Sequence, residues 1–134
     1  MEAVIRHLGN LKFEAVAREH RLICDQPVEN QGTDRGMTPP ELLLASLGTC
    51  AGYYAAQYLQ TRGLSAQRVV VRVTAEKATQ PARLGSFVIE VEAPDVDPKH
   101  HDGLLRSVKA CLIHNTLSST PNIDLHVHTA VPVA

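Results

Sequence analysis

Three cysteines, Cys24, Cys50 and Cys111, are the residues of this 134-residue sequence that are best able to carry covalent chemistry. A thiolate can attack a peroxide oxygen to become a sulfenic acid, which a second thiol then converts to a disulfide. An odd number of cysteines without Cys-x-x-Cys spacing makes a poor disulfide framework and a poor zinc site. The cysteines are therefore either buried apolar residues or a reactive pair, and the sequence predicts no metal and no organic cofactor.

Cys50 falls within the clearest helix of the sequence. Thr38-Pro39-Pro40-Glu41 fits a capping box, with Thr38 as the N-cap residue and Glu41 at the third helical position. The helix is predicted to continue to about Thr61 or Arg62 and to end at Gly63. The apolar face of this helix is predicted to carry Leu43, Leu47, Cys50 and Tyr54.

The position of Cys50 within its helix limits how the thiol could be activated. Cys50 follows the N-cap residue by twelve positions, which is about 18 Å along a helix axis. The positive end of the helix dipole is too far away to lower the pKa of the thiol by much. A reactive thiolate at Cys50 therefore requires a cation from another element, and otherwise Cys50 is a core residue.

A second predicted helix carries Cys111. It begins near Asp97-Pro98, an N-cap residue followed by proline, and continues through Cys111 to about Leu117. His114 follows Cys111 by three residues and is expected on the same helix face. Its imidazole could stabilise a thiolate or shuttle a proton. Alternatively, His114 is only a polar residue at a frayed helix end.

The remaining elements are predicted to be strands, because apolar and polar residues alternate along them. The strands are predicted over Glu2–Leu8, Lys12–Ala17, Arg21–Cys24, Arg68–Glu76, Phe87–Glu92 and Ile123–Val127. The order is therefore βββ-α-ββ-α-β, an α+β fold in which an antiparallel sheet packs on two helices. We expect a single domain over residues 1–134. Glycines inside the first helix, Gly48 and Gly52, indicate that another backbone or helix approaches it closely.

Composition excludes several classes of function. Hydrophobic residues make up 44% of the chain, which argues against disorder. A net charge of −1 and only 4% aromatic residues give no reason to expect nucleic acid or an anionic membrane as a partner. The sequence contains no segment typical of a signal peptide and no apolar stretch long enough to cross a bilayer. We expect a cytoplasmic protein.

Two segments resemble the paired cysteine motifs of the OsmC/Ohr family. They are Met37–Cys50, which reads MTPPELLLASLGTC, and Ala110–Leu117, which reads ACLIHNTL. The resemblance extends over essentially the whole chain. It implies an intertwined homodimer with two long helices per chain between the sheets, and a peroxidase that reduces organic hydroperoxides with electrons from a dithiol such as a lipoyl group. It also implies that Cys50 is the peroxidatic and Cys111 the resolving cysteine.

The sequence departs from the family pattern at the charged residues that activate the thiolate. In the hydroperoxide-resistance branch a glutamate near the start of the first helix pairs with an arginine. Aligned on the cysteine, that glutamate falls on Pro40, and the neighbouring Glu41 fits the capping box better than a catalytic role. Arg35, in the loop before the helix, is the first choice for the cation. The alternatives on the early strands are Arg18, Arg21 and Lys12.

Two other functions remain open for the same residues. An apolar cleft lined by Leu43, Leu47 and Tyr54 could bind a fatty acyl group or another hydrophobic ligand, with incidental thiols. Alternatively, formation of a Cys50–Cys111 disulfide could act as a redox sensor that changes the partners of the dimer. Only catalytic turnover separates the sensor from the peroxidase, because both form the disulfide.

Overall fold

A computed structural model describes residues 1–130 and is organised around one long helix, α1 (Pro39–Gln60). The helix begins as predicted, because the Thr38 side chain accepts from the Glu41 N–H and the Glu41 carboxylate accepts from the Thr38 N–H. It ends with Thr61 as the C-cap residue, and Gly63 follows in the left-handed region at φ +70°. Glycine adopts this conformation at little cost, so Gly63 is the predicted stop signal.

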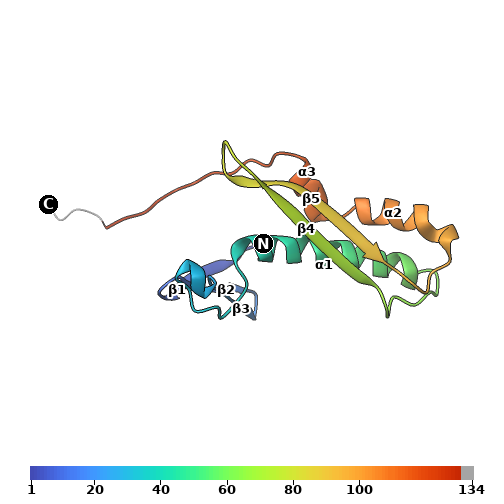
Figure 1. Ribbon diagram of the computed structural model, residues 1–134, viewed down its shortest axis with the longest axis horizontal. Helices are drawn as coiled ribbons and strands as arrows, with labels where there is room; N and C mark the ends of the chain where they lie inside the picture. Colours follow the sequence, from blue (N-terminus) through green and yellow to red (C-terminus); the bar gives the residue numbers. More distant parts are fainter. Residues whose placement is uncertain (131–134) are drawn as a thin grey trace.

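A long antiparallel hairpin crosses α1 (Figure 1). Its strands are β4 (Val70–Ala78) and β5 (Arg83–Glu92), and Val73 lies opposite Ile89 in the register. The strands extend further toward each other than the sequence predicts, and only residues 79–82 remain as the turn. The pattern of residues 77–85 favours a loop. In the structure, Lys77 and Ala78 instead pair with Leu84 and Arg83 and complete the ladder at the tip of the hairpin.

The two glycines of α1 allow this hairpin to approach the helix. A Cβ atom on Gly48 would lie 3.1 Å from a methyl group of Val73, and one on Gly52 would lie 3.6 Å from a methyl group of Val71. The neighbours are thus valine side chains of β4, and not the backbone or second helix that the glycines suggested. The buried face of α1 repeats every four residues and consists of Leu47, Ala51, Ala55 and Leu59.

The first three strands form a separate antiparallel sheet at one end of the molecule (Figure 1). Its strands are β1 (Val4–Gly9), β2 (Lys12–Ala17) and β3 (His20–Cys24), in that spatial order. This sheet makes no extensive contact with the helices of residues 1–130. Apolar side chains therefore remain uncovered on it, and Ile5 is 55% exposed.

The second predicted helix is not continuous. A 3-10 turn (Pro98–His100), capped by Asp97, leads into α2 (His101–Lys109), and a separate helix α3 (Leu112–Ser118) follows. Cys111 breaks the helix, because its backbone is extended (φ −54°, ψ 128°) and its sulfur accepts from the His114 N–H as an N-cap group. The prediction of one helix through Cys111 is therefore wrong.

The last predicted strand, Ile123–Val127, is also absent from the structure. Residues 119–130 extend away from the rest of the chain (Figure 1), and they pair with no strand among the described residues. Ile123, Leu125 and Val127 are between 79% and 86% exposed. Alternation of apolar and polar residues suits a strand, but a strand forms only when it pairs with another one, and this segment pairs with none of the strand edges within residues 1–130.

No helix within residues 1–130 combines the length and the apolar character that crossing a lipid bilayer requires.

Candidate active site

The thiols of Cys50 and Cys111 come together where α1 meets the start of α3. Burial raises the pKa of Cys50, but the Cys111 thiol donates a hydrogen bond to its sulfur, and the N–H groups of Ile113 and Leu112 add further hydrogen bonding. The net effect is that the pKa of Cys50 lies below the ordinary value of a thiol. Cys50 is therefore the better nucleophile of the pair.

Cys111 is buried to the point of having no exposed surface. Burial raises the pKa of this thiol, and its hydrogen bond to Cys50 raises the pKa further. Its sulfur also accepts from the His114 N–H at 3.4 Å. The two cysteines are thus polarised in opposite directions: their surroundings lower the pKa of Cys50 and raise the pKa of Cys111.

Backbone N–H groups stand at the position where the sequence predicted a cation. The first N–H groups of a helix have no partner within that helix and carry part of its positive dipole. In this protein they belong to α3, and the interruption at Cys111 directs them toward Cys50. Sequence reasoning missed this contribution, since no glycine or proline marks the break between Ala110 and Leu112. The spacing of Cys111 and His114, which matches a capping pair, is the one signal that could have revealed it.

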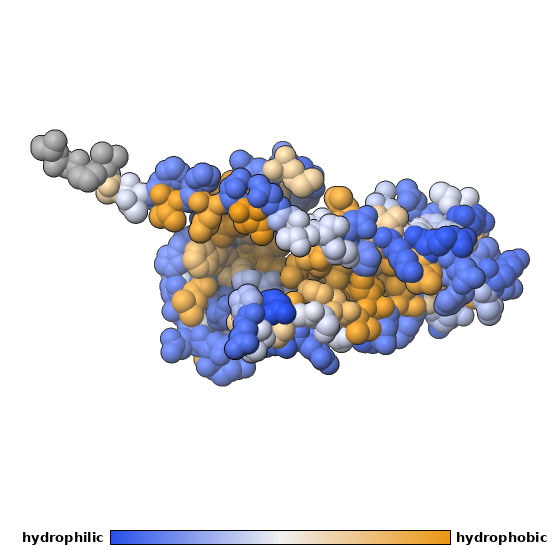
Figure 2. Space-filling model, turned by 90° about the horizontal axis from the view of Figure 1, so that it is seen from above, coloured by the Kyte–Doolittle hydropathy of each residue, from blue (hydrophilic) through white to orange (hydrophobic). Residues whose placement is uncertain are grey.

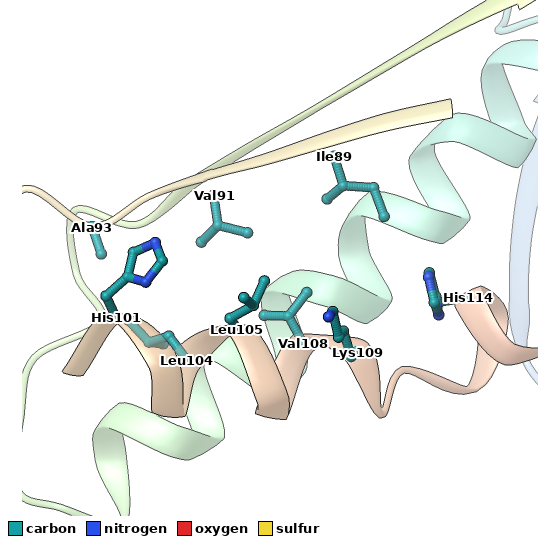
Figure 3. Close-up of a pocket in the computed structure, with 9 residues that line it drawn as sticks. All are labelled: Ile89, Val91, Ala93, His101, Leu104, Leu105, Val108, Lys109 and His114. Carbon is teal, nitrogen blue, oxygen red and sulfur yellow. The ribbon is translucent and has the colours of Figure 1, made fainter. Parts of the chain in front are cut away.

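Two cavities lie on either side of Ile89 and His114, the first between β5 and α2 and the second between β5, α1 and α3, and neither cysteine lines them. The first has a volume of about 360 Å³, and Figure 3 shows its apolar walls with His101 at one end and His114 at the other. The second has a volume of about 400 Å³ and is lined by Leu47, Phe87 and Leu117, among others. Both cavities are lined by Ile89 and His114. Figure 2 shows apolar residues gathered in a hollow bordered by hydrophilic ones.

The predicted substrate-binding residues are only partly placed at these cavities. Leu47 is buried and lines the second cavity, one helical turn before Cys50. Leu43 and Tyr54 line neither cavity. The carbonyl oxygen of Tyr54 accepts from the Ser107 hydroxyl at 3.1 Å, so this part of α1 holds α2 in place. The sequence did not reveal the wall that β5 contributes.

Arg35 is exposed, and its guanidinium makes no ion pair within residues 1–130. Its backbone N–H instead donates to the buried carboxylate of Asp25 at 3.1 Å. Among the alternatives, Arg21 pairs with Glu14 at 3.4 Å on the surface of the N-terminal sheet. The described residues therefore bring Cys111 and the start of α3 to Cys50, and they do not bring Arg35 there.

Glu41 is engaged at the start of α1. Its carboxylate accepts from the N–H of Thr38 at 3.0 Å and from the hydroxyl of Thr38 at 2.8 Å. These hydrogen bonds hold the pKa of Glu41 below its ordinary value, with the backbone donor as the larger cause. The capping box predicted from the sequence is thus confirmed.

Residues 1–130 contain no cluster of three or more His, Cys, Asp or Glu side chains arranged to hold a metal ion.

The chain belongs to the OsmC-like protein family, whose family model matches residues 32–126. This match covers most of the chain and includes both cysteines of the site. No curated protein matches the sequence significantly.

Solved structures share the fold at low sequence identity. A protein of Psychrobacter arcticus 273-4, assigned to osmotic stress and detoxification, superposes with a TM-score of 0.76 at 21% identity over 85% of each chain. An OsmC-like protein of Mycoplasma pneumoniae gives a TM-score of 0.68 at 21% identity, over 89% of this chain and 86% of that one. The organic hydroperoxide resistance protein OsmC of Legionella pneumophila gives 0.65 at 15% identity, over 87% and 89%. The α+β fold predicted from the sequence is thereby confirmed.

Proposed function

We propose that this protein is a thiol peroxidase that reduces organic hydroperoxides, with Cys50 as the peroxidatic and Cys111 as the resolving cysteine. Family membership supports a general role in redox stress. The polarised thiol pair carries the more specific proposal, because the cysteine with the lowered pKa is hydrogen-bonded to the one with the raised pKa.

The reaction needs no group beyond the two thiols and a reductant. The Cys50 thiolate attacks the distal peroxide oxygen, the O–O bond breaks, and the alkoxide takes a proton to become an alcohol. Cys50 is then a sulfenic acid. Cys111 attacks its sulfur, the disulfide forms, and the sulfenic oxygen leaves as water with the Cys111 proton. A dithiol, such as a lipoyl group, reduces the disulfide and is itself oxidised to a disulfide.

In this proposal the start of α3 supplies the stabilisation for which the sequence suggested Arg35. The N–H groups of Ile113 and Leu112 favour the thiolate without a guanidinium. The first cavity is largely apolar, which suits the carbon substituent of an organic hydroperoxide better than hydrogen peroxide.

Stopped-flow consumption of cumene hydroperoxide with a dithiol reductant tests the proposal. Cys50→Ser is expected to lose turnover by at least about 1,000-fold, because the nucleophile is removed. Cys24→Ser is the matched control, since it removes a half-buried thiol of β3 away from the pair, and its rate should remain that of the wild type. Undiminished turnover in Cys50→Ser would refute the assignment.

The cavities also support a second candidate, the binding of an apolar ligand by a protein with little peroxidase activity. Their volumes of about 360 and 400 Å³ are within the range of small-molecule sites. Native mass spectrometry of protein purified from cells separates the two functions. A retained hydrophobic ligand together with no turnover would favour binding, and turnover without a ligand would favour the peroxidase.

We also propose that the protein acts as a homodimer. The N-terminal sheet is uncovered, and the segment Ile123–Val127 presents its apolar residues without a partner strand among residues 1–130. A second copy can cover both surfaces, which would give this segment the strand edge that it lacks. Light scattering should give twice 14.6 kDa for the wild type and for His126→Lys, and a smaller mass for Leu125→Lys on the apolar side. A wild-type monomer would refute the dimer.

A further inference from the structure

His114 connects the thiol pair with both cavities. Its backbone N–H donates to the Cys111 sulfur at 3.4 Å, and its imidazole lines the first and the second cavity. It is the one polar residue of the described chain that lines both, since Ile89 is the other shared residue. Figure 3 shows the ring standing on the helical side of the first cavity, on the same side as Lys109. A ligand in either cavity therefore lies next to His114.

Neither ring nitrogen of His114 has a hydrogen-bond partner within residues 1–130, and one of the two is buried. Nδ1 is buried and makes no hydrogen bond within residues 1–130. A buried N–H group without an acceptor is rarer in proteins than a buried acceptor without a donor. The tautomer that leaves Nδ1 bare and carries the proton on Nε2 is therefore favoured, and the Nε2–H is the group available to a ligand.

We propose that His114 is a further catalytic residue, whose Nε2–H donates a hydrogen bond to the leaving oxygen of the hydroperoxide. This inference rests on the proposed peroxidase function. When the Cys50 thiolate bonds to the distal oxygen, the O–O bond electrons move to the proximal oxygen, which becomes an alkoxide. The alkoxide is stabilised by His114 and takes its proton from water to form the alcohol, while His114 keeps its own proton.

The placement of the side chains supports this role. The N–H groups of Leu112 and Ile113 favour negative charge on the Cys50 sulfur before the attack, and His114 follows them directly along α3. During the attack the charge moves away from sulfur to the proximal oxygen, which carries the carbon substituent. The apolar walls of the first cavity, beside His114, provide space for that substituent. A donor preorganised where charge develops is the arrangement that stabilises a transition state.

The test compares two peroxides that differ in the basicity of the leaving oxygen. tert-Butyl hydroperoxide releases a strongly basic alkoxide, whereas peracetic acid releases a carboxylate that needs little stabilisation. We expect His114→Phe to reduce kcat/KM about 100-fold for tert-butyl hydroperoxide. For peracetic acid the reduction should remain within about threefold. His114→Gln, which retains an N–H donor, should recover most of the loss.

His20→Phe is the matched control, because His20 is an exposed residue of β3 far from this site in the sequence, and it should leave both rates unchanged. An equal loss for both peroxides in His114→Phe would assign a merely structural role to the residue and overturn the inference. Unchanged rates in His114→Phe would also overturn it. In either case the loss of turnover in Cys50→Ser would still support the peroxidase.

A measurement without turnover tests the tautomer. Nitrogen-15 NMR of the protein with labelled histidine distinguishes a protonated nitrogen from a bare one, and the resonances absent from His114→Gln belong to His114. We expect the proton of His114 on Nε2. A proton on Nδ1 would overturn the inference, even if the wild-type protein showed no peroxidase activity at all.

Discussion

Asp25 and Cys111 are both fully buried groups that can carry a negative charge, and their surroundings differ in the number of donors. The Asp25 carboxylate accepts four hydrogen bonds, at 2.6 Å from the Thr33 hydroxyl and at 2.8, 3.1 and 3.3 Å from the N–H groups of Gln26, Arg35 and Thr33. The Cys111 sulfur accepts one backbone N–H at 3.4 Å and donates to Cys50. The Asp25 carboxylate is therefore saturated with hydrogen-bond donors, and the Cys111 sulfur is not.

The consequence appears in how the two groups ionise. The Thr33 hydroxyl is the main cause that lowers the pKa of Asp25 to about 2, and backbone N–H groups lower it further although burial opposes them. Burial and the hydrogen bond to Cys50 raise the pKa of Cys111. A saturated carboxylate fixes the loop that precedes α1, whereas an undersatisfied thiol stays available for reaction.

The largest expected effect is on turnover, and it distinguishes the region around Cys111 from the region around Asp25. Cys111→Ser should still consume one equivalent of peroxide per chain, because Cys50 is intact. Its steady-state rate should fall about 100-fold, because the sulfenic acid has no resolving partner. Stopped-flow and steady-state assays with cumene hydroperoxide measure the two rates, and trapping with dimedone should label Cys50.

Asp25→Asn provides the contrast with Cys111→Ser. This variant is assayed well below its melting temperature. Its turnover per folded molecule should stay within about twofold of the wild type, since the carboxylate does not touch the thiols. A loss comparable to that of Cys111→Ser would mean that the Asp25 loop is part of the catalytic site, and the distinction between the two regions would fail.

The second prediction concerns stability, and here the larger effect is expected from the substitution of Asp25. Asp25→Asn replaces a buried carboxylate with four donors by an amide that cannot accept all of them, so we expect the Tm to fall by at least about 5 °C. Asp34→Asn is the matched control in the same loop, because Asp34 is exposed at φ 55° and asparagine tolerates that conformation. Calorimetry measures both variants, and equal Tm values would show that the hydrogen bonds of Asp25 do not fix the loop.

The smallest effect is a pH dependence of stability. The depressed pKa of Asp25 contributes stability above its ordinary value of 3.8, and this contribution is lost as the pH falls through about 2. Thr33→Val removes the 2.6 Å hydrogen bond and Thr33→Ser retains a hydroxyl. The valine variant should be less stable than the serine variant at pH 7, and the difference should narrow between pH 4 and pH 2. A difference independent of pH, measured by urea unfolding, would contradict this assignment.

Local signals in the sequence were sufficient for the first helix and the sheets. The capping box at Thr38 and the stop at Gly63 depend on contacts within a few residues, so the predicted bounds of α1 are nearly those of the structure. The strand Lys12–Ala17 is found as predicted, and the alternation that predicted it is likewise local. The hairpin strands were predicted too short, because the polar residues near its tip belong to the ladder by pairing and not by pattern.

The candidate site was only partly predictable. The sequence indicated the pairing of Cys50 with Cys111 through the two motifs, and the structure places their thiols within hydrogen-bonding reach. It did not indicate the N–H groups of α3 or the wall formed by β5. These depend on a helix break at Cys111 that a sulfur–backbone hydrogen bond stabilises, and the surrounding residues are all compatible with a continuous helix.

The sequence by itself determined the bounds of α1 and most of the strands, because capping, turn chemistry and periodicity act over a few residues. Of the predicted apolar face of α1 only Leu47 belongs to the buried face, which otherwise consists of Ala51, Ala55 and Leu59. Only the tertiary structure shows that the pKa of Cys50 is lowered while that of Cys111 is raised, because the pKa of each sulfur depends on burial and on donors from a distant segment. It also decided the conformation of Ile123–Val127, where the pattern suits a strand but the segment pairs with no strand of residues 1–130.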